Sequence, residues 1–207
     1  LISMPGMYDI EGFRKYGQTM FDDNEVVVVT EKIHGQNFRA VSANGVLHVG
    51  SRTRWLSTDP DTNTWARVAQ RYELAEKLAN FPGLVFFGES YGNNADMRYG
   101  VEPAKTGDAL AIFDIWNSGL GRWHDHAAVV SMCKFIGLPR APVLTSGPFG
   151  DIRDGLLPLA EGTTTIGGAK HVREGWVIKP AVERRDNRIG RVILKLHGEG
   201  YLTRKGA

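Results

Sequence analysis

The chain has 207 residues, of which 42% are hydrophobic and 23% are charged, a composition typical of a folded protein with a sizeable core. Its apolar stretches are too short to span a bilayer, and its start lacks the features of a secretory signal. A single cysteine, Cys133, excludes an intramolecular disulfide and a thiolate zinc cluster. We expect a cytoplasmic monomer without a membrane contact. The formal charge of +2 does not by itself indicate a nucleic-acid binder.

The first half of the chain predicts a strand, a hairpin and a long helix. Residues 25–33 have the apolar character of a strand that enters the interior. Residues 38–43 and 46–51 flank an Asn-Gly pair, which suits a type I′ hairpin turn because both of its positions need a positive φ. Residues 63–80 carry apolar side chains at three- and four-residue spacing, and a Pro-Gly pair follows this helical pattern.

The second half predicts two strand pairs and one more helix. Residues 84–89 and 109–116 are apolar strands separated by a polar, glycine-rich connection. Residues 125–136 form a helical pattern that ends before a glycine and a proline. Residues 174–179 and 191–197 predict a final strand pair joined by a charged loop.

These elements favour an α+β fold with antiparallel sheets flanked by helices over a doubly wound parallel fold. No internal repeat, low-complexity tract or linker divides the chain, so we expect one domain over residues 1–207.

The segment Glu-Lys-Ile-His-Gly-Gln-Asn, residues 31–37, carries the most chemical information. Lys32 closes a buried strand, and a lysine amine is a nucleophile only where burial or nearby cations disfavour its charged form. Gly35 allows a tight turn and lets a ligand come close. Alone, this K-x-x-G pattern is common by chance, and a surface lysine before a turn is then the better explanation.

Five further segments place charged or aromatic side chains at strand ends or inside strands. Their characteristic residues are Arg52, Glu89, Phe113, Glu174 with Lys179, and Lys195. An uncompensated charge in such a place is costly, so these side chains require partners or a ligand.

In this order and at these separations, the six segments resemble motifs I, Ia, III, IIIa, IV and V of the covalent nucleotidyltransferases, the superfamily of ligases and mRNA capping enzymes. His34, followed by Asn37, resembles the nick-sealing RNA ligase branch, because DNA ligases and capping enzymes usually carry an aspartate at the histidine position. The resemblance covers residues 25–202, nearly the whole chain. It implies an α+β, ATP-grasp-like adenylation domain with ATP in the cleft between its antiparallel sheets.

The resemblance also implies an ATP-dependent RNA ligase that works by three phosphoryl-type transfers. The lysine attacks ATP and forms lysyl-AMP, AMP passes to an RNA 5′-phosphate, and a 3′-hydroxyl displaces AMP and seals the strand. The expected cofactors are ATP and Mg²⁺ or Mn²⁺. The expected partner is RNA with a 5′-phosphate and a 3′-hydroxyl, as in a nicked duplex under repair.

The motif positions imply a role for each residue. Lys32 is the nucleophile, while Lys179 and Lys195 neutralise the charge that develops on the phosphate and favour the neutral amine. Phe113 is expected to stack on the adenine. The residues expected to bind ATP are Glu31, Ile33, Asn37, Arg52, Glu89, Phe113 and Glu174.

Two carboxylates are candidates for the metal, and several basic residues are candidates for RNA. Of Glu89 and Glu174, one is expected to bind the ribose and the other to bind the metal ion, which is held largely through water. The residues expected to contact RNA are Arg52, Asn37, Arg184 and Arg185. The last two belong to a basic group in the last quarter of the chain, for which a solvated face is the simpler interpretation. The group consists of Arg184, Arg185, Arg188, Arg191, Lys195, Arg204 and Lys205.

Two features depart from the nick-sealing branch. Its motif V often carries two lysines one residue apart, whereas Lys195 is followed here by Leu196 and His197. Either His197 substitutes as a pH-sensitive donor, or one lysine suffices. The chain also ends soon after this motif, so it is either a minimal ligase or a piece of a longer one.

Other functions stay open. A DNA ligase or a GTP-using capping-type enzyme would share the motifs. A nucleic-acid binding module without catalysis would not need a lysine at the K-x-x-G position.

Three local patterns resemble other kinds of site. Residues 88–92 fit the G-x-S-x-G elbow of serine hydrolases, but that elbow needs a helix directly after the serine, and residues 93–96 predict a polar loop. Residues 162–170 resemble a phosphate loop, but Gly168 stands where lysine is required. Residues 124–126, His-Asp-His, suit a helix start better than a metal site.

Overall fold

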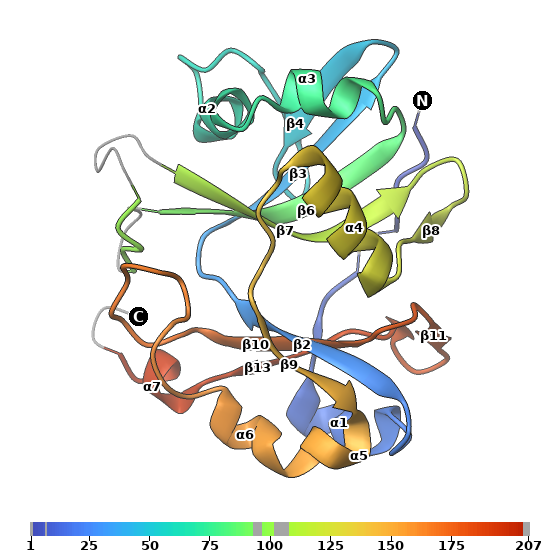
Figure 1. The fold of residues 1–207 in the computed structure, drawn as a ribbon, viewed down its shortest axis with the longest axis vertical. Helices are drawn as coiled ribbons and strands as arrows, with labels where there is room; N and C mark the ends of the chain where they lie inside the picture. The colour runs from blue at the N-terminus through green and yellow to red at the C-terminus, as the bar shows by residue number, and fades with distance from the viewer. Residues whose placement is uncertain (1, 7, 93–96, 102–107, 205–207) are drawn as a thin grey trace. The chain divides into compact units, whose positions relative to one another are not determined.

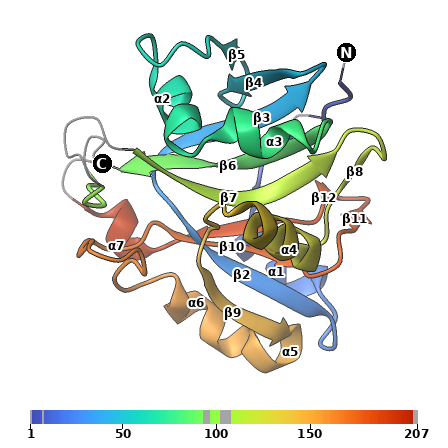
Figure 2. The same ribbon diagram turned by 45° about the horizontal axis from the view of Figure 1, so that its top comes forward.

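The computed structural model describes residues 2–6, 8–92, 97–101 and 108–204, which form two compact units (Figure 1, Figure 2). The first unit contains the described residues of 1–6, 34–94 and 100–140, and the second contains those of 7–33, 95–99 and 141–207. Each unit has a mainly antiparallel sheet and a hydrophobic cluster of its own. This confirms the predicted α+β class. The expectation of one domain over residues 1–207 stays a prediction.

The first unit is built on an antiparallel sheet in the order β5-β4-β3-β6-β7-β8. Asn44 and Gly45, between β3 and β4, have φ angles of 50° and 74°, which confirms the predicted hairpin. Both β6 and β7 are longer than predicted, so Glu89 lies inside a strand and not at its end. The strands are β3 (Gln36–Ala43), β4 (Val46–Gly50), β5 (Trp55–Leu56), β6 (Leu84–Gly92), β7 (Asp108–Asn117) and β8 (Arg122–Trp123).

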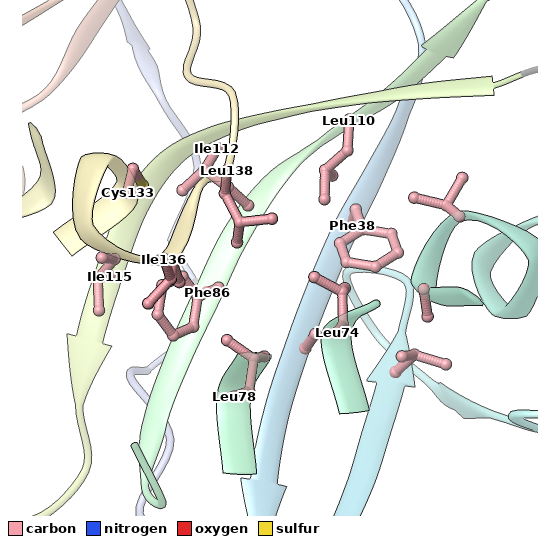
Figure 3. Close-up of a cluster of buried hydrophobic side chains, with 14 of the residues drawn as sticks. Phe38, Leu74, Leu78, Phe86, Leu110, Ile112, Ile115, Cys133, Ile136 and Leu138 are labelled. Atoms are coloured by element: carbon pink, nitrogen blue, oxygen red, sulfur yellow. The ribbon is translucent and has the colours of Figure 1, made fainter. Parts of the chain in front are cut away.

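Helices α2 (Thr64–Arg71), α3 (Leu74–Ala79) and α4 (His126–Ile136) cover one face of this sheet. Figure 3 shows side chains of these helices meeting Phe38 and Phe86 of the strands in a buried cluster. Because side chains alternate along a strand, the neighbours of these two residues lie on the opposite face. The sheet therefore directs Asn37 away from the helices.

The predicted single helix over residues 63–80 is wrong, because the chain divides it into α2 and α3 at Glu73. The backbone of Glu73 is left-handed, with φ 54° and ψ 41°. Just before it, the hydroxyl of Tyr72 accepts a hydrogen bond from the Leu110 backbone N–H at 3.2 Å. The break moves the buried face by one position, so that Leu74 is buried, whereas Ala75 is exposed.

The second unit is built on a sheet in the order β1-β13-β10-β2-β9. Among these described strands, β1 and β13 pair in parallel and the other neighbours pair antiparallel. The sheet members β2, β10 and β13 confirm the predicted strands at 25–33, 174–179 and 191–197, although 192–193 lie outside a strand. The strands are β1 (Glu11–Gly12), β2 (Val26–Lys32), β9 (Val143–Pro148), β10 (Gly175–Pro180) and β13 (Leu194–His197), with a separate pair β11 (Arg185–Asp186) and β12 (Gly190–Arg191).

Short helices cover one face of this second sheet (Figure 1). Trp176 of β10 is fully buried there, and its indole N–H donates to the carbonyl oxygen of Leu156 at 2.8 Å. These helices and β9 were not predicted, because such short segments show no sustained periodicity. They are α1 (Phe13–Met20), α5 (Phe149–Ile152), η1 (Arg153–Gly155) and α6 (Leu156–Leu159), and α7 (Glu199–Leu202) follows β13. Within the described ranges, no helix is long and apolar enough to cross a membrane.

The helix break at Glu73 predicts different effects of two glycine substitutions on the free energy of unfolding. Glu73→Gly should leave the free energy of unfolding unchanged or raise it, because glycine tolerates the left-handed backbone. The matched control Glu76→Gly, inside α3, should lower it by about 1 kcal/mol. Urea denaturation of both variants measures the difference, and equal losses would indicate a continuous helix.

Candidate active site

The register of three strands gathers the predicted catalytic lysines on one face of the second sheet. Gly175 of β10 lies opposite Lys32 of β2 on one side and opposite His197 of β13 on the other. Lys195 lies opposite Val177, two positions further along β10. Residues that face each other across antiparallel strands share a face, so these side chains lie opposite the face that carries Trp176. Lys179 shares their face by the same alternation.

Glu174 directly precedes β10 and contacts the predicted nucleophile. Its Oε1 lies 2.5 Å from Nζ of Lys32 and 3.2 Å from Nε2 of His197. The side chain of Glu174 is 6% exposed, whereas that of Lys32 is 26% exposed. The lysine thus forms a charge-assisted hydrogen bond at the border between a buried carboxylate and solvent.

Opposing effects act on the carboxyl group of Glu174. Burial acts to raise its pKa, but the hydrogen bond with His197 and the charge of Lys32 outweigh burial and hold the pKa below its ordinary value. Glu174 is therefore a carboxylate at neutral pH. Its negative charge is available to hold an amine or a hard cation.

Two motif glycines are required by close backbone contacts. Gly175 has a φ of 151°, and a Cβ there would overlap the carbonyl oxygen of Leu196. A Cβ on Gly35 would overlap the carbonyl oxygen of Ser90. The tight turn expected at Gly35 is not what requires glycine, because its φ is not in the positive range. In each case a neighbouring strand occupies the space of the missing side chain.

Lys179 belongs to a network of buried charges. Its Nζ lies 3.9 Å from Oε1 of Glu183, and the same oxygen accepts a 2.6 Å hydrogen bond from Arg191. Arg191 also donates to the hydroxyl of Tyr8 at 2.7 Å. Glu183 thus compensates two buried cations and holds Lys179 on the sheet face. Neither Glu183 nor Tyr8 was predicted, and the four-residue spacing from Lys179 to Glu183 is the only sequence signal for this contact.

Glu31, the neighbour of Lys32, has a different set of partners. Its carboxylate is 2% exposed and accepts hydrogen bonds from the hydroxyls of Thr164 and Thr165 and from the Thr165 backbone N–H. These contacts attach the segment 162–170 to β2, the strand that carries Lys32. The predicted contact of Glu31 with ATP stays a prediction. No sequence signal pointed to the two threonines.

The remaining predicted ATP residues include several that lie in the first unit. Asn37 of β3 lies opposite Glu89 of β6. Among the described residues, Oδ1 of Asn37 is buried without a hydrogen-bond partner, and its contact with a ligand stays a prediction. Arg52, beyond β4, is exposed, whereas Ile33, in the second unit, is buried beside Lys32.

Phe113 occupies an irregular position in β7. Asp114 pairs with Phe87 and Ile112 pairs with Gly88, so Phe113 is the extra residue of a β-bulge. A bulge redirects a side chain locally and is frequent beside active sites. Phe113 therefore does not follow the regular alternation of the strand. The apolar sequence of this strand did not predict the bulge.

Acidic residues neutralise much of the basic group in the last quarter of the chain. Arg184, a predicted RNA contact, is held by Glu25 at 2.6 and 2.7 Å. Hydrogen bonds from Arg188 hold the pKa of Asp186 at about 2. Arg185, also a predicted RNA contact, is exposed on β11. Lys205 lies outside the described residues.

The structure places the residues of two alternative local patterns and the single cysteine. Ser90 lies within β6, and the predicted polar loop at 93–96 falls outside the described residues. Asp125 is the N-cap position of α4, as predicted. Burial raises the pKa of the Cys133 thiol to about 11, which leaves it unreactive. The described part of the chain holds no group of three or more metal-ligating side chains.

The sequence matches the RNA ligase family over residues 25–197. Because this match spans most of the chain, the protein belongs to the RNA ligase family, a family of covalent nucleotidyltransferases. The comparison with curated proteins gave no match.

Solved structures show the same fold. The chain is similar to Naegleria gruberi RNA ligase with PPi, at 20% identity and a TM-score of 0.78. A lysine-to-alanine variant of that ligase with ATP and Mn gives the same values, and a lysine-to-methionine variant with AMP and Mn gives 21% and 0.76. The first two matches cover 98% of this chain but 59% of the ligase chain. This chain therefore has the nucleotidyltransferase fold and spans about three fifths of those chains.

The lowered pKa of Glu174 predicts a pH-dependent contribution to stability. A carboxyl whose folded-state pKa is depressed stabilises the fold above its unfolded pKa, and this stability is lost as the pH falls through the folded pKa. Glu174→Gln should therefore unfold at lower urea concentration at neutral pH, and the difference from wild type should shrink below about pH 4.5. Urea titrations of metal-free protein at stepped pH measure this. The exposed control Glu76→Gln should show little change, and a pH-independent loss in Glu174→Gln would contradict the prediction.

Proposed function

We propose that this chain is an ATP-dependent RNA ligase that forms lysyl-AMP at Lys32, transfers AMP to an RNA 5′-phosphate and joins that end to a 3′-hydroxyl. The observation that carries the proposal is the contact of Lys32 with Glu174 on a sheet face that also bears Lys179 and Lys195. Membership of the RNA ligase family supports it.

In the first step, Nζ of Lys32 attacks the α-phosphorus of ATP, an N–P bond forms, and the bond to pyrophosphate breaks. An ammonium group paired with a carboxylate has no lone pair and does not attack, so Glu174 must release Lys32 and the ammonium must first lose a proton to water. Lys179 and Lys195 then neutralise the charge on the phosphate oxygens. Pyrophosphate is the leaving group of this step and AMP is the group that is transferred. The similar structures of the Naegleria ligase contain PPi in one case and AMP in another.

The residues present suit Mg²⁺ or Mn²⁺. Both are hard cations that prefer oxygen ligands and keep several waters, and Glu174 remains a carboxylate at neutral pH. The metal supplies charge neutralisation on the phosphates when bound. Glu174 and Glu89 are the carboxylates we assign to hold it and the ribose. The structure of a Naegleria ligase variant with ATP and Mn supports the use of ATP and a divalent metal ion.

In the later steps, after pyrophosphate has left, the two RNA ends are the reactants. An oxygen of the RNA 5′-phosphate attacks lysyl-AMP, so that a phosphoanhydride bond forms and the N–P bond to Lys32 breaks. The 3′-hydroxyl then attacks that 5′-phosphate while AMP leaves. We assign Phe113 to the adenine and Asn37 to the phosphates or the RNA end. Arg52 is exposed and can form bidentate contacts with phosphate, which suits a residue that meets a polymer. The repair of nicks in duplex RNA is the role that we propose.

Lys32→Ala should abolish covalent labelling of the protein. Incubation with α-labelled ATP and Mg²⁺, followed by denaturing electrophoresis, measures lysyl-AMP directly. The loss should be complete because the phosphoramide bond needs the amine. The control Lys134→Ala removes an exposed lysine of α4 and should label as wild type. Undiminished label in Lys32→Ala would refute the assignment, and labelling by GTP in place of ATP would indicate a capping-type enzyme.

The strand that carries the 3′-hydroxyl distinguishes an RNA ligase from a DNA ligase. Two duplexes that differ only in RNA or DNA on the 3′-hydroxyl side of one nick should be sealed at different rates, with RNA faster by at least about tenfold, because the 2′-hydroxyl distinguishes the two. Denaturing gels of the ligated product measure both rates. Equal or faster sealing of the DNA strand would indicate a DNA ligase.

A further inference from the structure

Arg39 and Trp55 form a cation–aromatic pair in the first unit, on the sheet face opposite the helices. The guanidinium carbon of Arg39 lies 4.0 Å from the centroid of the Trp55 ring. Arg39 of β3 lies opposite Gly50 of β4, which in turn lies opposite Trp55 of β5. A Cβ on Gly50 would be 3.1 Å from Cε3 of Trp55. The missing side chain of Gly50 thus lets the guanidinium reach across one strand to the ring.

Arg39 is partly buried and lacks a counter-ion among the residues that the structure describes, since no carboxylate pairs with it and its buried Nε has no acceptor. Arg67 and Arg173 also have no ion pair among the described residues, but their guanidinium groups donate hydrogen bonds to oxygens of the protein. By contrast, Arg184 is bound by Glu25 and Arg191 by Glu183. A partly buried cation without an anion is costly, so an anionic ligand would compensate Arg39.

Trp55 places an exposed aromatic ring beside Arg39. It lies on the edge strand β5, is 43% exposed, and meets the ring of His48 edge to face. Arg52 and Arg54 are exposed in the segment that leads into β5. An exposed ring among arginines suits nucleic acid, because bases stack on aromatic faces and phosphates pair with guanidinium groups.

We propose that Arg39 and Trp55 form a subsite for one nucleotide of the RNA substrate, with its base on Trp55 and its phosphate at Arg39. The inference rests on the proposed RNA ligase function. ATP offers the same chemistry, but Phe113, assigned to its adenine, lies on β7, four strands from β5 in the same sheet. Four strand spacings amount to roughly 19 Å, so the base on Trp55 belongs to a different nucleotide.

Fluorescence anisotropy with a labelled RNA duplex that contains one 5′-phosphorylated nick tests the subsite in the absence of ATP and metal. Trp55→Ala should weaken binding by about tenfold, because the stacked base loses its platform. Trp55→Phe should retain most of the affinity, whereas Trp55→Leu, which keeps apolar bulk without a ring, should lose it. Arg39→Gln should weaken binding and reduce the slope of log affinity against log salt by about 1.

Arg122→Gln is the matched control, because it removes the same charge from β8 at the opposite edge of the sheet, and it should bind as wild type. Thermal unfolding verifies that each variant is folded. Wild-type affinity in folded Trp55→Leu and Arg39→Gln would overturn the inference, as would equal losses in Arg39→Gln and Arg122→Gln. A raised KM for ATP with unchanged RNA affinity would assign the pair to ATP and also overturn it. Trp55-dependent RNA binding in a protein that forms no lysyl-AMP would refute the proposed function and leave the subsite standing.

Discussion

The register of β2, β10 and β13 is the constraint on which the candidate active site depends. It aligns Lys32, Gly175 and His197 in one row and keeps the other motif lysines on the same face. A slip of one residue would turn those lysines toward the hydrophobic cluster around Trp176. Gly175 opposes such a slip, because only a residue without a Cβ can lie so close to the Leu196 carbonyl. Gly175 therefore helps to fix the register that places Lys32 on this face.

Charge compensation explains how this face tolerates so many ionisable groups. Glu174 compensates Lys32, and Glu183 compensates Lys179 together with Arg191. Each contact lowers the cost of burial and also fixes a side chain before any substrate arrives, which is the condition for electrostatic catalysis. The same reasoning underlies the proposed subsite. Arg39 has no carboxylate partner among the described residues, so an anionic ligand would stabilise it, whereas Arg184 and Arg191 are already paired with carboxylates.

Local signals made the strands predictable from the sequence, and they also led to the assignment of Lys32 as the nucleophile, which stays a prediction. The hairpin followed from an Asn-Gly pair, and Lys32 followed from a motif whose order could be compared with other motifs. Contacts between distant segments could not be predicted in this way. Thr164 reaches Glu31 across 133 positions of the chain, and no spacing rule links them. The break at Glu73 was missed because tertiary packing of Leu74 overrides a helical pattern that continues through it.

The register also bears on the departure in motif V, where His197 stands in place of a second lysine. Any residue at this position lies opposite Gly175 and faces the carboxylate that holds Lys32. A lysine there would bring a second ammonium group to Glu174, whereas an imidazole can donate a hydrogen bond whether it is charged or neutral. Its Nε2 lies 3.2 Å from Oε1 of Glu174, the atom that also contacts Lys32. The contact fits the first of the two explanations left open by the sequence, in which His197 acts as a donor, and the role of His197 stays a prediction.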